Sequence, residues 1–190
     1  MLKTLLIIIS GPPGAGKTTL GKRIAKELNL PIVHKDGIKE LLFDKLGWSD
    51  RAWSKKLGIA TYALLYYFLE AQLSAGRSCI VESNFHAEYD TEQFLALKAK
   101  YDFEPLQICC VADGEVLFQR FKERATLGER HPGHVETLNL EEFKPALLRG
   151  RDEVLEIGGA VIEVDMTDFG RVDYEGLVEE IRFVLCSGKE

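Results

Sequence analysis

The sequence lacks any apolar stretch long enough to cross a membrane, and it has no excess of basic residues. Its 24 lysines and arginines are outnumbered by 30 aspartates and glutamates, giving a net charge of -6. Proteins that bind duplex DNA or RNA neutralise many phosphates, so this balance argues against a nucleic-acid partner. The apolar run Leu5–Ile9 is too short for a signal peptide or a membrane span, and no cleavage-type sequence follows it. We therefore expect a cytoplasmic protein with no membrane partner.

Cysteines are few, and none of the four has the C-x-x-C spacing of a metal or redox site. We expect them to be buried, reduced thiols. The chain also has no internal repeats, low-complexity tracts or Ser/Gly-rich linkers. Its 190 residues suit one compact domain, residues 1–190.

Short apolar runs alternate with longer helical patterns along the chain. This alternation predicts the α/β class, with one parallel sheet between layers of helices. The expected strands are Leu5–Ile9, Ile32–His34, Ser78–Val81, Leu106–Val111 and Val161–Val164. The expected helices cover approximately 17–28, 36–46, 50–75, 88–100, 114–127, 140–156 and 174–185, with Asp36 as one N-cap. Such sheets bind ligands at the carboxyl ends of their strands, so the residues after each strand are the candidates for a site.

A glycine-rich loop follows the first expected strand and matches G-x-x-x-x-G-K-[ST] without a mismatch. Its glycines allow backbone N–H groups to point inward at phosphates, and the following helix adds positive partial charge there. Lys17 can reach the β- and γ-phosphates of a nucleoside triphosphate, and the Thr18 hydroxyl can bind Mg²⁺. The residues predicted to bind ATP are Gly11, Pro12, Pro13, Gly14, Ala15, Gly16, Lys17, Thr18, Thr19 and, from farther along the chain, Arg120.

Two carboxylates follow neighbouring strands. Asp36 could accept a proton from an attacking hydroxyl or hold Mg²⁺ through water, or it could simply cap its helix. Glu82 could bind Mg²⁺ through water or contact substrate, and Asn84 and Phe85 would then face the acceptor. An ordinary strand-to-helix turn is the alternative for this second segment. Lys39, on the helix of Asp36, is expected to be solvated.

Three arginines follow the fourth expected strand. Arg120 and Arg124 are four residues apart and share a helix face, and Arg130 lies in the irregular segment beyond. Phosphoryl transfer needs cations around the transferring oxygens, so we expect a mobile lid that brings arginines over the phosphates. A solvated charged helix is the alternative, because glutamates are interspersed with these arginines.

The chain at this point resembles the small P-loop kinases and phosphotransferases, a group that includes shikimate and gluconate kinases, chloramphenicol phosphotransferase and zeta toxins. The resemblance covers nearly the whole chain, and its most specific part is the glycine-rich loop. It also rests on Asp36–Glu40, Asp113–Arg124 and Val161–Thr167. It implies a P-loop NTPase fold, with five parallel strands in the order 2-3-1-4-5 and a helical lid at about 120–150.

The same resemblance implies roles for individual residues. Asp36 matches the acidic residue that binds or deprotonates the acceptor hydroxyl, and Arg120 would pack near the adenine. Arg124 or Arg130 would touch phosphate, and 165–169 would border the adenine pocket. Shikimate kinases carry Asp-x-Asp after the second strand, where this chain has His34, and a glycine run where it has Glu82-Ser-Asn-Phe. These departures argue against shikimate as the acceptor.

The sequence therefore predicts an ATP-dependent kinase that phosphorylates a hydroxyl of a small molecule. The predicted catalytic residues are Lys17, Asp36, Arg124 and Arg130, and Mg²⁺ would bind Thr18, with Asp36 or Glu82 through water. Two alternatives remain: a toxin- or resistance-type phosphotransferase acting on a sugar nucleotide or antibiotic, and an ATPase switch acting on a protein partner. The sequence leaves open whether the protein is a monomer or a homodimer.

Trp48, Trp53 and Arg51 could contribute to the acceptor site or could pack in the core. His131 and His134, three residues apart, are expected to make lid contacts to substrate or phosphate rather than to bind a metal.

Overall fold

The computed structural model describes residues 4–128, 130–135 and 140–187. Its five strands form one all-parallel sheet in the order β2-β3-β1-β4-β5, as predicted. The strands are β1 Thr4–Ser10, β2 Ile32–His34, β3 Cys79–Glu82, β4 Phe103–Val111 and β5 Ala160–Asp165. Within the described residues, no helix is both long and apolar enough to traverse a bilayer.

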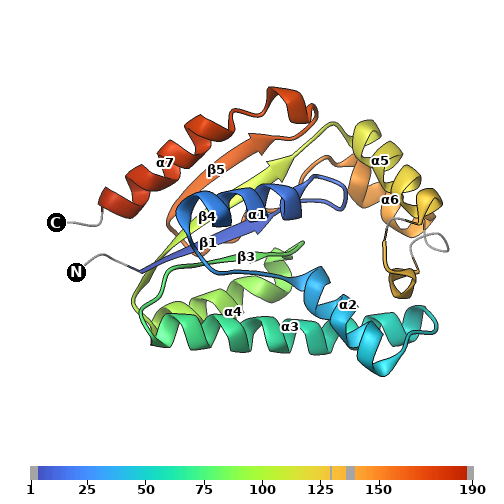
Figure 1. The fold of residues 1–190 in the computed structure, drawn as a ribbon, viewed down its shortest axis with the longest axis horizontal. Helices are drawn as coiled ribbons and strands as arrows, with labels where there is room; N and C mark the ends of the chain where they lie inside the picture. Colours follow the sequence, from blue (N-terminus) through green and yellow to red (C-terminus); the bar gives the residue numbers. More distant parts are fainter. Residues whose placement is uncertain (1–3, 129, 136–139, 188–190) are drawn as a thin grey trace.

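Helices cover both faces of this sheet and extend past its carboxyl edge (Figure 1). Helices α1 and α7 lie on one face, and α3 and α4 lie on the other, while α2, α5 and α6 gather at the carboxyl edge. The α-helices are α1 Lys17–Leu28, α2 Lys35–Leu46, α3 Arg51–Ser74, α4 Ala87–Lys100, α5 Gly114–Leu127, α6 Leu140–Leu148 and α7 Tyr174–Ser187. Two short 3₁₀ turns, η1 Pro132–His134 and η3 Phe169–Arg171, complete the described elements.

The central strand β1 is buried on both faces because its side chains alternate between two apolar cores. Leu5, Ile7 and Ile9 pack with residues of α1, α5 and α7. Leu6 and Ile8 pack with residues of α3, β3 and α4. Burying each such side chain stabilises the fold by roughly 1.5–3 kcal/mol. This rigid strand ends at Ser10 and fixes the start of the glycine-rich loop.

Several element boundaries differ from the sequence prediction, and three of these differences have an identifiable physical reason. The N-cap of α2 is His34 rather than Asp36, because His34 Nδ1 accepts a hydrogen bond from the Gly37 N–H at 3.0 Å. Strand β4 begins at Phe103 rather than at Leu106 and includes Pro105, because proline is tolerated near the start of a strand. Helix α6 stops at Leu148, because Gly150 adopts a φ of +74° and its carbonyl accepts a hydrogen bond from the Ala112 N–H.

Candidate active site

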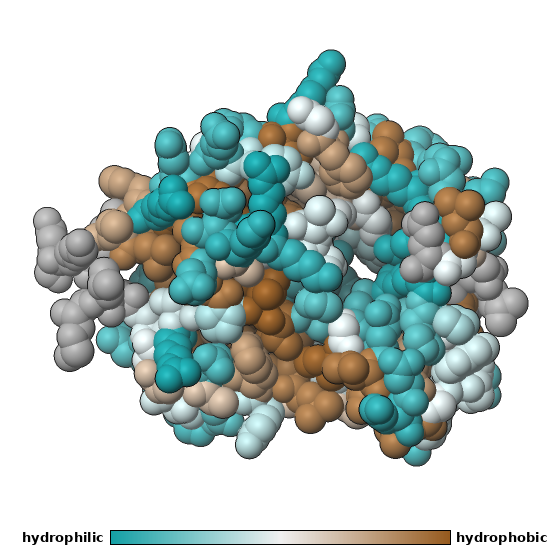
Figure 2. Space-filling view, viewed as in Figure 1, coloured by the Kyte–Doolittle hydropathy of each residue, from teal (hydrophilic) through white to brown (hydrophobic). Residues whose placement is uncertain are grey.

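The carboxyl ends of β1, β2 and β3 bring several of the predicted residues to one cavity of 1270 Å³. Lys17 and Thr18 follow β1, Asp36 follows β2, and Glu82 ends β3, where it is paired in register with both Ile9 and His34. Among the lining residues, lysines and arginines outnumber aspartates and glutamates eight to four, although the whole chain is acidic. Figure 2 shows the surface hollowed between the α2 and α5 regions, with mostly hydrophilic residues around the hollow.

The glycine-rich loop has the backbone conformation of a phosphate-binding loop. Gly11, Gly14 and Gly16 have φ values of +139°, +84° and +79°, a region that other residues rarely adopt. A Cβ at Gly11 would lie 2.3 Å from the carbonyl oxygen of Cys110, so the loop also passes too close to β4 for a side chain. Lys17 Nζ donates to the carbonyl oxygens of Gly11 and Pro12 at 2.7 and 3.0 Å. The ammonium is thus held at the mouth of the loop, and one of its three N–H groups has no part in these bonds.

Glu82 lies directly beside the loop. It is 4% exposed, and its Oε2 accepts a hydrogen bond from the Thr18 hydroxyl at 2.7 Å. A hydroxyl and a buried carboxylate are the hard oxygen ligands that Mg²⁺ prefers. These two groups therefore fit the predicted magnesium site, where Thr18 would bind the ion directly and Glu82 would reach it through water.

Arg120 lines the cavity on the side opposite α2 and is held there by several contacts. Its guanidinium donates to the carbonyl oxygens of Met166 and Thr167, both at 2.8 Å, and stacks over the Phe169 ring at 3.9 Å. A Cβ at Gly16 would lie 2.8 Å from that ring. The phosphate loop, Arg120 and the segment after β5 are therefore packed together, and the adenine pocket that the resemblance implies beside them stays a prediction.

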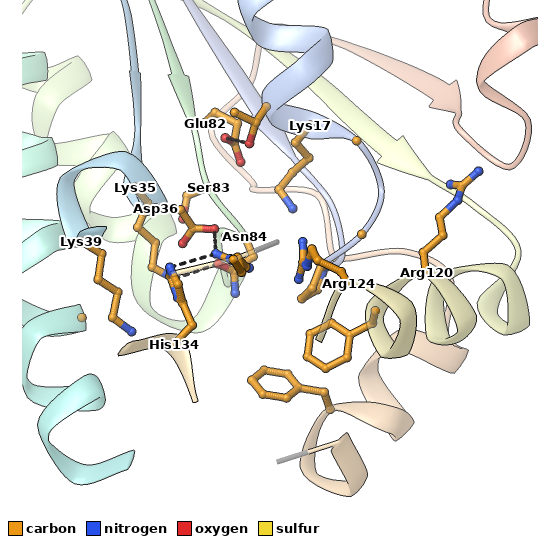
Figure 3. Close-up of a pocket in the computed structure, with 18 of the residues that line it drawn as sticks. Lys17, Lys35, Asp36, Lys39, Glu82, Ser83, Asn84, Arg120, Arg124 and His134 are labelled. Atoms are coloured by element: carbon orange, nitrogen blue, oxygen red, sulfur yellow. Dashed lines mark hydrogen bonds and ion pairs between the residues drawn. The ribbon is translucent and has the colours of Figure 1, made fainter. Parts of the chain in front are cut away.

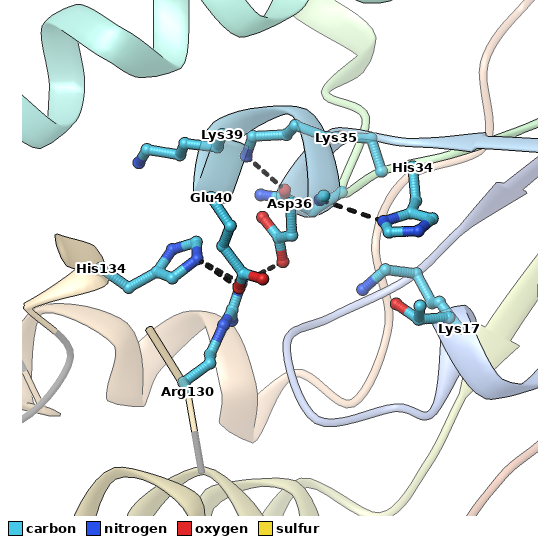
Figure 4. Close-up of polar contacts among 12 residues, drawn as sticks. Lys17, His34, Lys35, Asp36, Lys39, Glu40, Arg130 and His134 are labelled. Carbon is cyan, nitrogen blue, oxygen red and sulfur yellow. Dashed lines mark hydrogen bonds and ion pairs between the residues drawn. The ribbon is translucent and has the colours of Figure 1, made fainter. Parts of the chain in front are cut away.

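Asp36 forms an ion pair with Arg130, which comes from the segment after α5 (Figure 4). Burial acts to raise the pKa of Asp36, but Arg130, Lys35 and His134 outweigh it and hold the pKa well below its usual range. The carboxylate is therefore ionised at any physiological pH and is a hydrogen-bond acceptor. Two predicted catalytic residues thus lie in direct contact.

Helix α2 holds the 130–135 segment through two further pairs. His134 Nε2 lies 3.0 Å from Glu40 Oε1, and His131 Nε2 lies 3.3 Å from Asp44 Oδ1. Asp36, Glu40 and Asp44 recur every four residues, so one face of α2 presents three carboxylates to this segment. Burial and then Arg130 lower the pKa of His134 to about 3, so that imidazole is neutral at physiological pH.

The Phe43 ring lies between these two histidines. Its centroid is 5.1 Å from His131, in a stacked arrangement, and 5.4 Å from His134, edge on. The histidines thus contact α2, and the sequence prediction that they touch substrate or phosphate stays untested.

Sequence reasoning missed Lys35 and was wrong about Lys39. The predicted solvated Lys39 is 7% exposed and lines the cavity, and its Nζ donates to Ser54 Oγ at 3.0 Å. Lys35 Nζ donates to Asn84 Oδ1 at 2.9 Å. Figure 3 shows both lysines on the α2 side of the cavity, facing Arg120 and Arg124 on the α5 side. The sequence feature that could have identified both lysines is their spacing of four residues, which puts them on one face of a helix that follows a strand of the sheet.

A family model described as an AAA domain matches residues 6–147, three quarters of the chain. A solved structure agrees over the full length: a protein from Chloroflexus aurantiacus j-10-fl, provisionally described as a kinase, is 38% identical. The alignment covers 100% of both chains, with a TM-score of 0.89. The chain belongs to the AAA-domain family. Its resemblance to P-loop small-molecule kinases is thereby confirmed.

Curated relatives match this AAA-domain protein only locally. A shikimate kinase from Corynebacterium diphtheriae is 45% identical over 40 residues, which are 21% of this chain and 23% of that enzyme. A cytidylate kinase from Ignicoccus hospitalis is 41% identical over 44 residues, 23% of this chain and 26% of that enzyme. The chain thus spans about a quarter of the length of these relatives. A sugar kinase from Janibacter sp. HTCC2649, 19% identical over 98% of this chain and 96% of its own with a TM-score of 0.55, shares the fold.

Not every residue predicted for the acceptor site of the AAA-domain protein faces the cavity. Asn84 and Arg51 line it, but Phe85 does not. The prediction for Phe85 was wrong because the ring, 1% exposed, turns into the core and packs edge on against Phe94 at 5.1 Å. Trp48 and Trp53 are likewise absent from the lining, and the Trp53 indole N–H instead donates to the Gly47 carbonyl at 3.0 Å.

Gly133 of η1 packs closely against Phe43 of α2, so Gly133→Ala is expected to detach η1. A Cβ at this position would lie 2.7 Å from two atoms of the Phe43 ring. We expect a loss of about 1–3 kcal/mol in unfolding free energy, as for other overpacked sites. Denaturant unfolding measures this loss, and a change in Trp48 fluorescence, from a ring 6.4 Å from His131, reports the displacement.

Gly128→Ala is the control for this substitution, because a Cβ there meets nothing within 4 Å and adds only backbone strain at a φ of +66°. If the two variants lose equal stability and Trp48 fluorescence stays unchanged, the close packing of η1 on Phe43 is wrong.

Proposed function

We propose that this protein is an ATP-dependent kinase that transfers the γ-phosphate to a hydroxyl of a small molecule. The observation that carries this proposal is that Lys17 of the phosphate loop and the ionised Asp36 line one cavity. In this proposal Lys17 is the phosphate-binding cation and Asp36 the hydroxyl-binding carboxylate, and transfer occurs in the space between them. Phosphoryl transfer depends mainly on such positioning and electrostatic stabilisation.

Each charged group has a distinct task in this proposal. Lys17 and the loop N–H groups bind the β- and γ-phosphates, and Asp36 accepts a hydrogen bond from the acceptor hydroxyl and orients its oxygen. Because the low pKa of Asp36 makes it a weak base, orientation is its main contribution. Arg124 and Arg130 stabilise the negative charge on the transferring group. Thr18, and Glu82 through water, would hold Mg²⁺, which would neutralise charge on the phosphate oxygens.

Two features support ATP as the phosphate donor in this proposal. The Asn-Lys-x-Asp pattern that selects guanine is absent from the sequence. The wall formed by Arg120 and Phe169 offers a cation and a ring for stacking on a base.

The test is ATP consumption by the purified protein against a panel of hydroxyl compounds: hydroxy acids, sugars, nucleosides, nucleotides, sugar nucleotides, and aminoglycoside and phenicol antibiotics. Acceptor-dependent release of ADP, together with a phosphorylated product found by mass spectrometry, is the expected result. Release of ADP that no panel member stimulates, but that a protein partner does, would replace the kinase with an ATPase switch.

Glu82→Gln is expected to raise the Mg²⁺ concentration needed for half-maximal activity by roughly 10- to 100-fold, as for other residues that act behind a metal ligand. The amide can still accept the hydrogen bond from Thr18, so the loop should keep its structure. Glu92→Gln, an exposed change on α4, is the control. An unchanged Mg²⁺ dependence of the Glu82 variant would remove this carboxylate from the magnesium site.

A further inference from the structure

Lys39 is a buried ammonium with little to neutralise it. It is 7% exposed, and among the described residues its ammonium donates a single hydrogen bond, to Ser54 Oγ at 3.0 Å, and forms no ion pair. An ammonium group has three N–H donors, and burying its charge without an anionic partner is unfavourable. The Phe43 ring, 5.4 Å away, offsets this only in part.

The surroundings of Lys39 make its charge more unfavourable still. Lys35 lies one helical turn earlier on α2, and like charges at this spacing repel. Burial, and then Lys35, lower the pKa of Lys39 to about 8; Asp36 acts to raise this pKa, while Arg51 and Arg130 act to lower it further. Burial likewise lowers the pKa of Lys35. Two adjacent cations therefore face this part of the cavity.

The nearby carboxylates are engaged elsewhere. Asp36 pairs with Arg130, and Glu142 of α6 pairs with Arg51 at 2.9 Å and Lys55 at 3.5 Å. Neither carboxylate forms an ion pair with Lys39. In the described part of the chain, the positive charge of Lys39 and Lys35 at this end of the cavity thus has no anion in contact with it.

The space beside Lys39 is open. Gly58 of α3 faces the ammonium, and a Cβ built on it would meet only Lys39 Nζ, at 3.8 Å. The cavity reaches this point between α2 and α3, where Gly58, Ile59 and Tyr62 line it. A small group on a ligand could therefore reach the ammonium.

We propose that this end of the cavity binds an anionic group of the acceptor, a phosphate or a carboxylate, with Lys39 as its principal ligand and Lys35 beside it. The inference rests on the proposed kinase function and narrows its substrate class to hydroxyl compounds that carry a negative charge. One turn of α2 separates Asp36 from Lys39, so a single small molecule contacts both. The anionic group anchors the molecule at Lys39 while its hydroxyl meets Asp36.

The first experiment compares acceptors that differ only in their anionic group. Ribose 5-phosphate is paired with ribose, and gluconate with glucose, at saturating ATP. We expect kcat/KM to be at least tenfold higher for the anionic member of at least one pair, and the pair that responds distinguishes phosphate from carboxylate. Higher kcat/KM for the neutral members would overturn the proposal.

The second experiment uses Lys39→Met, which keeps the length of the side chain and removes its charge. With the better anionic acceptor, we expect its KM to rise at least tenfold and the KM for ATP to stay within twofold. The unliganded variant should also unfold at a higher temperature than the parent, because an unfavourable buried charge is gone. Lys45→Met, at an exposed position of α2, is the control and should change none of these values. A lower unfolding temperature with an unchanged acceptor KM would make Lys39 a purely structural residue.

The pH dependence of acceptor binding in Lys39→Arg tests whether the charge of Lys39 is what binds the acceptor. Lys39 has its pKa lowered to about 8, so acceptor binding should be strong below pH 8 and weaken as pH rises through that value. Arginine stays protonated, so this variant should keep its acceptor affinity above pH 8. Identical pH profiles for the parent and the arginine variant would assign the loss to another group.

Direct binding distinguishes failure of this inference from failure of the kinase function. If no acceptor is phosphorylated, ribose 5-phosphate and gluconate are titrated calorimetrically into protein saturated with a non-hydrolysable ATP analogue and Mg²⁺, so that the phosphate loop is already filled. Binding that Lys39→Met weakens at least tenfold supports the anion site without transfer. Absence of binding, or binding that the substitution does not change, overturns it.

Discussion

Replacing Lys17 with alanine is expected to lower ATP-dependent transfer by on the order of 10²–10³-fold, the usual effect of removing a group that stabilises transition-state charge. The Lys17 ammonium is held by the Gly11 and Pro12 carbonyls at the mouth of the loop, and no other described lysine follows the loop so directly. Affinity for ATP should fall as well, because the same charge binds the β- and γ-phosphates before transfer. Initial rates of ADP release and calorimetric titration with an ATP analogue measure the two effects.

Lys22→Ala is the matched control, since Lys22 is an exposed lysine of the same helix α1. It should change neither rate nor affinity. Thermal unfolding of both variants checks that the loop region stays folded. Transfer that survives in the Lys17 variant at the parent rate would place the nucleotide somewhere other than this loop.

Asp36→Asn is expected to reduce kcat by about 10²–10⁴-fold, the range for loss of a group that exchanges or orients a proton. Affinity for ATP should change less than twofold, because Asp36 faces the acceptor side of the cavity and not the loop. Asparagine also weakens the contact with Arg130, so the measured change combines the loss of the carboxylate charge with the loss of the Asp36–Arg130 ion pair. Steady-state kinetics with the acceptor found in the panel give kcat, and titration with the ATP analogue gives affinity.

Asp44→Asn controls for the loss of an ion pair alone. Asp44 lies two turns along α2 and contacts His131 at the far end of the same segment, away from the cavity. If Asp36→Asn and Asp44→Asn behaved alike in kcat, the role of Asp36 would be structural.

The phosphate loop could be predicted from the sequence because its chemistry is local. Nine consecutive residues supply the glycines, the lysine and the hydroxyl, and the preceding apolar strand and following helix are visible in the same stretch. The order of the strands followed from the resemblance. Its agreement with the structure reflects how strictly parallel α/β folds constrain their connections.

The acceptor side could not be predicted in the same way because its contacts join distant parts of the chain. Asp36 and Arg130 are 94 residues apart, and nothing in either local sequence indicates that they meet. Lys39 looked like a solvated helix residue because a lysine usually is one. Its burial depends on α3 packing against α2, with Ser54 and Gly58 facing its ammonium. The prediction for Phe85 was wrong for the opposite reason. Its position after β3 suggested that the ring faces the cavity, but the ring packs in the core.

The contact between Gly16 and Phe169 has a consequence for any attempt to change which nucleotide the protein accepts. Phe169 and Met166 lie against the backbone of the phosphate loop, at distances where a Cβ on Gly16 would collide with both. Redesigning the surface that meets the base therefore also moves the loop that meets the phosphates. Variants at position 169 that change the base preference should therefore also have a lower catalytic rate. A second, compensating substitution within the loop would be needed to restore that rate.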